Sequence, residues 1–390
     1  MSLKSQYNFK EATLDPDFAS ESLKNFKELL EAALSFVVIS MPGVGVSYFL
    51  KYLATKDFAR FFHIDLYALP TLTQHEFYKL LLTELGGKSG LKTDESLLIE
   101  TKKILKTFSQ KHDKIVLIFS RFDQLKNAFD WNFLSNIQSL ATISPGKIVL
   151  IFTSIRPLYE IATDALSGGN LNFYSEELYF KPYSKNDLRK ILTIEPGRIT
   201  SKEAMEKLLD LSGGHNQLLH ILLSSQKQQN LSLDQFVKLQ MKELVAYLPY
   251  QQRKQIQKIA LGKKLEEVDD YLLGVGLVKK SGSTFELFSP LLSEYIRLNL
   301  PVKLPLKEAK LFKLLRRNIG NVVTKEELFA EVWPARNASQ SDAGGDEIDD
   351  NATDWALDAL IYRLRKHPFI KSNGYIIESH KKVGYTLIQA

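Results

Sequence analysis

The stretch FVVISMPGVGVSYFLKYLA, residues 36–54, decides the fold of the first half of the chain. Its first five residues form an almost wholly apolar run, which is typical of a strand buried on both faces. A turn with two glycines follows, and from Val46 onward the apolar residues recur at helical spacing. A strand, a glycine turn and a helix in this order direct backbone N–H groups toward one point at the helix N-terminus, an arrangement that binds anions.

Similar strand-like runs recur at 61–66, 115–119, 148–152 and 178–180, and helical stretches separate them. An amphipathic helix is expected over 20–35, just before the first strand. Strands that alternate with helices predict a parallel sheet with helices on both faces.

The remainder of the chain loses the strand signal and then regains it in hairpins. We expect an α/β domain over 1–180, a helical lid over 181–244, helices with one hairpin over 245–299, a proline-containing linker over 300–305 and a last domain over 306–390. Both 245–299 and 306–390 combine several helices with a hairpin, which is the winged-helix pattern. In the last domain, Thr324 and Glu327 have the spacing of a capping box at a helix start.

Composition excludes several classes of protein. Of 390 residues, 44% are hydrophobic, 25% are charged and none is cysteine, so a disordered chain, disulfides and thiolate metal sites are excluded. The seven histidines are scattered, so we expect no metal site. No apolar run reaches the roughly 18–20 residues of a membrane span, and no signal peptide is evident. We therefore expect a cytoplasmic protein without membrane contact, and its net charge of +6 permits nucleic-acid binding without requiring it.

The glycine turn matches most of the phosphate-loop pattern G-x-x-x-x-G-K-[ST] over residues 40–47. Gly43 and Gly45 allow the backbone to wrap an anion, and Ser47 supplies the final hydroxyl. Val46 stands where the pattern has its lysine, the charge that acts on the transferring phosphates.

A second charge is also missing at the end of the strand 115–119. Ser120 stands where the Mg²⁺-organising aspartate is expected, and Arg121 where a catalytic glutamate is expected. The nearest carboxylate is Asp123. The sequence therefore predicts no catalytic residue and favours a protein that is not an enzyme.

Residues 20–298 resemble the P-loop ATPase modules of the AAA+/STAND group, including its origin-recognition-like members. The resemblance rests on the altered loop and on the segments IVLIFSRFDQL, IVLIFTSIRPL, LSGGHNQLL and FELFSPLLSEYI in this order. It implies a polar sensor near Thr153 and a lid contact near His215. The nucleotide-binding residues expected are Gly43, Val44, Gly45, Val46, Ser47, Tyr48, Thr153 and His215.

Three uses of this module stay open: a relic or protein-interaction domain without ligand, a module that binds ATP or ADP without turnover, and a working ATPase in which other residues replace the missing charges. Arg156 is either a sensor or trans-acting finger, or a surface arginine that caps a strand end.

Residues 306–390 resemble the OmpR-type DNA-binding domain of response regulators. The resemblance rests on VVTKEELFAEVW (322–333), LDALIYRLRKHPFI (357–370) and KKVGYTLI (381–388). It implies that the third helix enters the major groove while the hairpin, the wing, grips the DNA backbone. The DNA-binding residues expected are Thr353, Trp355, Ala356, Ala359, Tyr362, Arg363, Lys366, His380, Lys381 and Lys382. Alternatively, the basic end of the third helix is a solvated helix end that complements the helix dipole.

Charge is segregated within this last domain. Residues 301–390 hold 14 Lys or Arg and 12 Asp or Glu, but six of the acids and one arginine lie in 334–354. The rest therefore carries 13 basic and six acidic residues, as a phosphate-contacting surface requires. The acidic loop 335–351 is a spacer, a screen for the basic face or a docking site for a basic partner.

Together these patterns predict a multidomain protein with a P-loop ATPase-like parallel-sheet domain, a helical lid and two winged-helix domains. We expect a DNA-binding transcriptional regulator whose degenerate P-loop module is used for sensing a signal or for assembly. The alternatives are a nucleotide-switched STAND-type ATPase and a protein-binding scaffold. Expected partners are double-stranded DNA, RNA polymerase or a sensor protein, and further copies of the chain.

Overall fold

The computed structural model describes residues 9–88, 90–194, 201–225, 234–299, 304–333, 353–367, 370, 375–381 and 383–389. The chain divides into two compact units, Met1–Leu292 and Ser293–Ala390. The boundary between them falls inside a helix, a few residues before the linker expected from the sequence. No helix in the described ranges is both long and apolar enough to cross a membrane.

Unit 1 contains a five-stranded parallel sheet in the order β2-β3-β4-β1-β5. The strands are β1 (Phe36–Ser40), β2 (Arg60–Asp65), β3 (Ile115–Ser120), β4 (Ile148–Ser154) and β5 (Glu177–Phe180). Every residue of β1, β3 and β4 is buried. This explains their continuous apolar sequences, and the predicted parallel sheet is confirmed.

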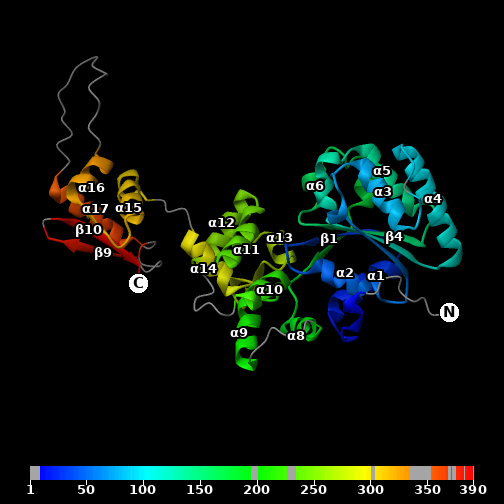
Figure 1. Ribbon diagram of the computed structural model, residues 1–390, viewed down its shortest axis with the longest axis horizontal. Coiled ribbons are helices and arrows are strands. Elements are labelled where there is room, and N and C mark those ends of the chain that lie inside the picture. Colours follow the sequence, from blue (N-terminus) through cyan, green and yellow to red (C-terminus); the bar gives the residue numbers. More distant parts are fainter. Residues whose placement is uncertain are drawn as a thin grey trace, which may run out of the picture. The chain divides into compact units, whose positions relative to one another are not determined.

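Helices cover both faces of this sheet. Figure 1 shows α1 and α2 on one face and α3, α4 and α5 on the other. The helices of this part are η1 (Lys10–Thr13), α1 (Ser20–Glu31), α2 (Val46–Ala54), η2 (Leu66–Ala68), α3 (Gln74–Glu84), α4 (Asp94–Lys111), η3 (Phe122–Ala128), α5 (Trp131–Ala141), α6 (Leu158–Ile161) and α7 (Gly169–Phe173). Side chains of Thr73, Thr93 and Asp130 cap the longer ones by accepting backbone N–H groups.

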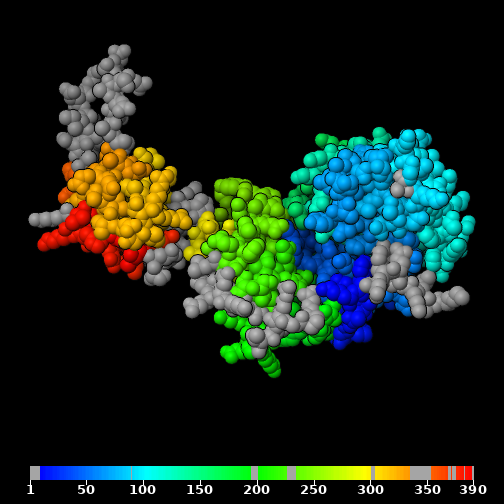
Figure 2. Space-filling model, viewed as in Figure 1, coloured from blue at the N-terminus to red at the C-terminus, as the bar shows by residue number. Residues whose placement is uncertain are grey.

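The second part of unit 1 is helical and adds one hairpin. Its elements are α8 (Lys185–Thr193), α9 (Lys202–Ser212), α10 (Asn216–Ser224), α11 (Gln235–Ala246), α12 (Tyr250–Ala260), α13 (Asp270–Gly274), β6 (Val278–Ser281) and β7 (Thr284–Leu287). Figure 2 shows these helices, in green, packed against the blue part of the unit. Ser184 caps α8 as its sequence position predicts, and α9 ends at Gly213, which has a left-handed backbone. A Cβ atom at Gly213 would lie 1.9 Å from the Phe288 carbonyl oxygen, so only glycine fits.

The helix α14 (Pro290–Asn299) contains the boundary between the units. In unit 2 the order of elements is α15 (Leu306–Arg317), β8 (Val322–Thr324), α16 (Lys325–Val332), α17 (Asp354–Lys366), β9 (Tyr375–His380) and β10 (Gly384–Gln389). The three strands form an antiparallel sheet in the order β8-β10-β9. Leu311, Leu328, Leu360, Leu364 and Leu387 are among the residues of its apolar core.

The structure confirms the capping box of Thr324 and Glu327 at the start of α16. It adds the short strand β8, which the sequence did not predict because its three residues include the helix cap Thr324 itself. The acidic loop 335–351, Pro301 and Lys382 lie outside the described residues. The division of residues 1–299 into sheet domain, lid and first winged helix stays a prediction.

Candidate functional site

The glycine turn adopts the backbone of a phosphate loop between β1 and α2. Gly43 has a φ of 75° and Gly45 a φ of 111°, both in the left-handed region that favours glycine. Gly45 is the N-cap residue of α2, so the helix begins at Val46 and its N-terminal N–H groups face the loop.

Four consecutive carbonyl oxygens of this loop accept hydrogen bonds from the helical part of unit 1. The Nε2 atom of His215 lies 2.8 Å from the Pro42 oxygen, and the Tyr183 hydroxyl donates to the Gly45 oxygen at 2.8 Å. The backbone N–H groups of Gln217 and Asn216 donate to Gly43 and Val44 at 3.0 and 3.3 Å. The loop is therefore held by the start of α10 and by the segment before α8.

We call these hydrogen bonds to the carbonyl oxygens of residues 42–45 the clamp. His215 is part of the clamp and does not face a ligand. It is fully buried, and its Nδ1 atom accepts the N–H of Leu218 at 3.1 Å. Burial lowers the pKa of His215 to about 4, so the ring is neutral at pH 7. The sequence placed His215 near the loop, but the expected contact with nucleotide is wrong because both ring nitrogens are engaged within the protein.

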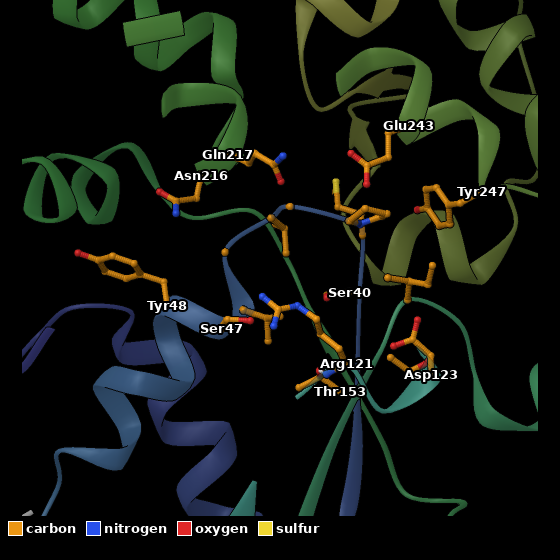
Figure 3. A pocket seen from close by; sticks show the side chains of 18 of the residues that line it. Ser40, Ser47, Tyr48, Arg121, Asp123, Thr153, Asn216, Gln217, Glu243 and Tyr247 are labelled. Carbon is orange, nitrogen blue, oxygen red and sulfur yellow. Dashed lines mark hydrogen bonds between the residues drawn. The ribbon is translucent and has the colours of Figure 1, made fainter. Parts of the chain in front are cut away.

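A pocket of about 720 Å³ opens beside the loop, within the size range of small-molecule sites. Figure 3 shows Ser47 and Arg121 on the sheet side and Asn216, Gln217, Glu243 and Tyr247 on the helical side. All the other expected nucleotide residues line it: Gly43, Val44, Gly45, Val46, Ser47, Tyr48 and Thr153. The sequence did not anticipate that Lys51, Arg121, Gln124, Asn216, Gln217, His220, Glu243 and Tyr247 also line it.

Arg121 is fixed at the end of β3 by three contacts. Its backbone is left-handed, with a φ of 62°, and its N–H donates to the Thr153 hydroxyl at 2.7 Å. Its Nη1 atom forms an ion pair with Asp65, and the guanidinium lies 5.1 Å from the centre of the Tyr67 ring. A left-handed backbone at a non-glycine residue costs about 1 kcal/mol, and here it directs a cation into the pocket.

The nearby carboxylate of Asp123 also lines the pocket. Burial raises its pKa to about 6, although hydrogen bonds from the backbone of Asp123 and Ile155 and the charges of Lys126 and Arg121 lower it. Asp123 therefore carries its full negative charge only above about pH 7.

The strand-end position that organises Mg²⁺ in P-loop ATPases carries no carboxylate in this chain. The hydroxyl of Ser120, at the position of the Mg²⁺-organising aspartate, lies 2.7 Å from Nε2 of His63. Asp65 is paired with Arg121. In the ranges that the structure describes, no group of three or more His, Asp or Glu side chains could hold a metal ion. No hydrolytic step through Mg²⁺ follows from this site.

Arg156 is neither a surface residue nor part of the pocket lining. It is buried, pairs with Glu160 at 2.5 Å and donates to the Gln252 side-chain oxygen at 2.9 Å. Its guanidinium lies 3.9 Å from the centre of the Tyr271 ring. It therefore joins the end of β4 to α12 and α13, and the expected roles as sensor or surface cap are wrong.

Unit 2 contains a second concave surface, a groove of about 810 Å³ between α17 and the β9–β10 hairpin. Of the expected DNA-binding residues, Trp355, Ala359, Tyr362, Arg363, His380 and Lys381 line it. Lys325, Asp358, Ile361, Arg365, Ser379, Gly384 and Tyr385, which the sequence did not single out, complete the lining.

The exposed face of α17 is aromatic as well as basic. The exposed fractions of Trp355 and Tyr362 are 80% and 60%. The Lys366 ammonium lies 5.4 Å from the centre of the Tyr362 ring. Thr353 is the N-cap residue of α17 and accepts the N–H of Ala356, so its hydroxyl has a structural partner.

Two arginines of α17 are engaged inside unit 2. The Nε atom of Arg363 lies 2.6 Å from Oε1 of Glu308, a buried residue of α15. Arg365 donates to the Ile377 carbonyl at 2.9 Å and to the Ser379 hydroxyl at 2.7 Å, which ties α17 to β9. The pair with Glu308 uses only the Nε atom, and the Arg363 side chain is 58% exposed and lines the groove, so its expected contact with a base or phosphate stays a prediction.

In the hairpin, Nε2 of His380 lies 2.8 Å from the Thr386 hydroxyl on the paired strand, so this side chain has a structural partner. Lys381 is exposed in the turn. Lys382 lies outside the described residues.

Comparison with known proteins gives similar structures but no matching sequence family. Neither a family model nor a curated protein matches the chain. A Walker-type ATPase of Pyrococcus abyssi, paby2304, superimposes with a TM-score of 0.49 at 15% identity, over 71% of this chain and 95% of that chain. The ORC1 protein of Aeropyrum pernix in complex with DNA gives 0.41 at 11% identity, over 98% and 94%. A STAND protein of Pyrococcus horikoshii with a tetratricopeptide repeat sensor gives 0.30 at 16% identity, over 75% and 44%.

The class of fold follows from the chain itself. Unit 1 has a parallel sheet with a glycine loop between its interior strand β1 and helix α2, and this is the fold of the P-loop ATPases. Val46 stands at the position of the lysine in the phosphate-loop pattern, and β3 ends at Ser120.

Proposed function

We propose that this protein is a DNA-binding regulator in which unit 2 binds duplex DNA and the pocket of unit 1 holds a nucleotide without turnover. The observation that carries the first part is the order of elements in unit 2: helix, strand, two helices and a hairpin, closed by a three-stranded antiparallel sheet. This is the order of an OmpR-type winged helix, with α17 as the recognition helix and β9–β10 as the wing.

Charge supports the same assignment. Outside 334–354, residues 301–390 carry 13 basic and six acidic residues. Lys366 lies at the exposed end of α17 and Lys381 is exposed in the hairpin turn. Cations on helix and wing would contact phosphates on either side of a groove. The role of Arg363 is then to hold α17 on α15, and base contacts come from the stripe of Trp355, Ala359 and Tyr362.

Neutralising the wing should weaken DNA binding in a salt-dependent way. We expect the double variant Lys381→Gln, Lys382→Gln to lower the slope of log K against log salt by about one to two, since each lost phosphate contact removes about 0.9. Fluorescence anisotropy of a labelled duplex at several salt concentrations measures this slope. The matched control is Lys279→Gln, Lys280→Gln in the hairpin of unit 1, which should leave the slope unchanged. An equal slope in wild type and the wing variant would remove the wing from the DNA interface.

The nucleotide part of the proposal is supported by the loop conformation and by the size of the pocket beside it. The residues that would bind are the loop amides of 43–48, the Ser47 hydroxyl and the Thr153 hydroxyl, and the ligand is ADP or ATP. Because Val46 and Ser120 supply neither of the charges that phosphoryl transfer uses, we expect no turnover. A nucleotide held in this way would act as a signal or as a support for self-assembly.

Measurement of ATP turnover separates this proposal from a nucleotide-switched ATPase. We expect no release of phosphate above the level of a protein-free control, with or without Mg²⁺. Robust turnover in wild type that disappears in Ser47→Ala would instead establish the ATPase.

One observation favours a second candidate function, a scaffold that binds other proteins. Two large aromatic side chains, Trp355 and Tyr362, are exposed on the same helix face, and exposed aromatics are typical of protein interfaces. Duplex binding that responds to salt but not to substitution of Lys381 and Lys382 would favour the scaffold.

A further inference from the structure

The phosphate end of the pocket in unit 1 carries cationic side chains where a P-loop ATPase has a carboxylate and a metal ion. The strand that should deliver the metal-organising aspartate ends at Ser120, and the next residue is Arg121. The Ser120 hydroxyl is turned to His63 at 2.7 Å, and both residues are buried. The residue that follows β3 therefore places a guanidinium, instead of a carboxylate, in the pocket lining.

Arg121 is held for this position by groups on both sides. Its backbone N–H donates to the Thr153 hydroxyl, and its Nη1 atom forms an ion pair with Asp65. This ion pair engages one nitrogen of a group that has five N–H donors in a planar fork. Such a fork matches two oxygens of a phosphate at once. Figure 3 shows the Arg121 side chain directed into the same space as Ser47.

Lys51 brings a second cation to the same place. It lies one helical turn after Ser47 on α2 and lines the pocket with it. The positive charges of Lys51 and Arg121 disfavour protonation of the buried His63 ring. Its pKa is lowered to about 4, first by burial, and Lys51 and Arg121 lower it further while Asp65 raises it. Lys51 and Arg121 are the two cationic side chains that line this pocket, and the carboxylates of Asp123 and Glu243 line it as well.

The geometry points to a phosphate site that works without a divalent metal: Arg121 and Lys51 contact the terminal phosphate oxygens of a nucleoside di- or triphosphate directly and replace Mg²⁺ as the counter-charge. This inference rests on the proposed nucleotide binding and specifies its chemistry. The loop amides take the inner phosphate, as in the P-loop pattern. Because Mg²⁺ on the nucleotide would neutralise the same oxygens, the metal-free nucleotide is the preferred ligand.

Calorimetric titration of the full chain with ADP, in EDTA and in excess Mg²⁺, tests this inference. We expect binding in EDTA to be at least as tight as in Mg²⁺. A charge-assisted contact is worth about 1.5–3 kcal/mol, so Arg121→Gln should weaken ADP binding in EDTA about 10- to 100-fold, and Lys51→Gln should weaken it in the same direction. The matched control is Lys126→Gln, a cation on η3 that does not line the pocket.

A further variant separates a binding role of Arg121 from a structural role of its ion pair. Asp65→Asn breaks the charge pair but leaves an amide oxygen for the Tyr67 N–H. If Arg121 binds phosphate, Asp65→Asn binds ADP as tightly as wild type or more tightly. If the pair only stabilises the fold, Asp65→Asn and Arg121→Gln lower the melting temperature equally and affect ADP binding equally, which would overturn the inference.

The remaining outcomes are equally decisive. Binding in Mg²⁺ that is lost in EDTA, or an Arg121→Gln variant that binds as Lys126→Gln does, contradicts the metal-free site while the proposed nucleotide binding stands. Failure of the wild-type chain to bind ADP or ATP in either condition overturns both.

Discussion

Replacing Arg363 by alanine is expected to destabilise unit 2 by about 2–3 kcal/mol. The Glu308 side chain is only 5% exposed and faces the Arg363 Nε atom at 2.6 Å, while the arginine itself is 58% exposed. Breaking a fully buried pair costs about 3–5 kcal/mol and losing an exposed pair at most about 1 kcal/mol, so this half-buried pair lies between them. In the described part of the chain, Oε2 of Glu308 has no hydrogen-bond partner, so the variant would leave a buried carboxylate without counter-charge.

The corresponding fall in melting temperature is about 10–20 °C for a unit of this size. Hydrogen exchange of the α17 amides in the full chain measures the loss of stability at this helix. Adding Glu308→Gln to Arg363→Ala should restore most of the protection, because the second change removes the uncompensated charge. Lys366→Ala, on the same helix and exposed, is the control and should leave the exchange unchanged. If Arg363→Ala lost DNA binding with unaltered exchange, Arg363 would be a DNA contact after all.

The second large effect is expected at His215. Alanine at this position removes the hydrogen bond to Pro42, the cap on the Leu218 N–H and the ring that stacks on Phe288 at 5.6 Å. Loss of a cap costs about 1 kcal/mol and truncation of a buried side chain about 2–5 kcal/mol. We therefore expect a loss of about 3–4 kcal/mol and a fall in melting temperature of about 10 °C for unit 1.

Two variants and a pH series check this prediction by thermal unfolding. His215→Asn keeps a capping side chain but not the reach to Pro42, so about half of the loss should return. His112→Ala, at the partly exposed C-cap residue of α4, should change stability by less than about 1 kcal/mol. Because the pKa of His215 is lowered from 6.5 to about 4 in the folded state, the unfolded chain binds more protons between these values. The contribution of His215 to stability is therefore complete above pH 6.5 and falls toward pH 4. A His215→Ala variant as stable as wild type at pH 7 would contradict the clamp.

The sequence predicts the strands of unit 1 and their parallel sheet well, because strands buried on both faces are nearly continuous apolar runs. The loop of residues 40–47 was likewise identified, since glycine and serine occupy fixed positions in it. Lys51 was missed because a lysine one turn into a helix has the same pattern whether it faces water or a pocket. Arg121 was recognised only as a missing carboxylate, because the sequence does not contain its left-handed backbone or its pair with Asp65.

Contacts between distant segments were the least predictable. Glu308 and Arg363 are 55 positions apart in the chain and join α15 to α17, and each residue taken alone resembles a surface charge. His215 was placed near the loop by its segment, but its use of both ring nitrogens depends on the position of Pro42. The buried bridge from Arg156 to Gln252 and Tyr271 follows from packing of the sheet domain against α12 and α13, which no local pattern encodes.

The central claim, that unit 2 docks on duplex DNA through cations on α17 and the wing, is tested most directly by the affinity of the full chain for a random-sequence duplex as salt is raised. The account predicts tight binding at low salt and a log K that falls linearly with log salt, with a shallower fall when Lys381 and Lys382 are neutralised. A chain that is well folded and fails to bind the duplex at low salt, or that binds with an affinity indifferent to salt, would contradict it.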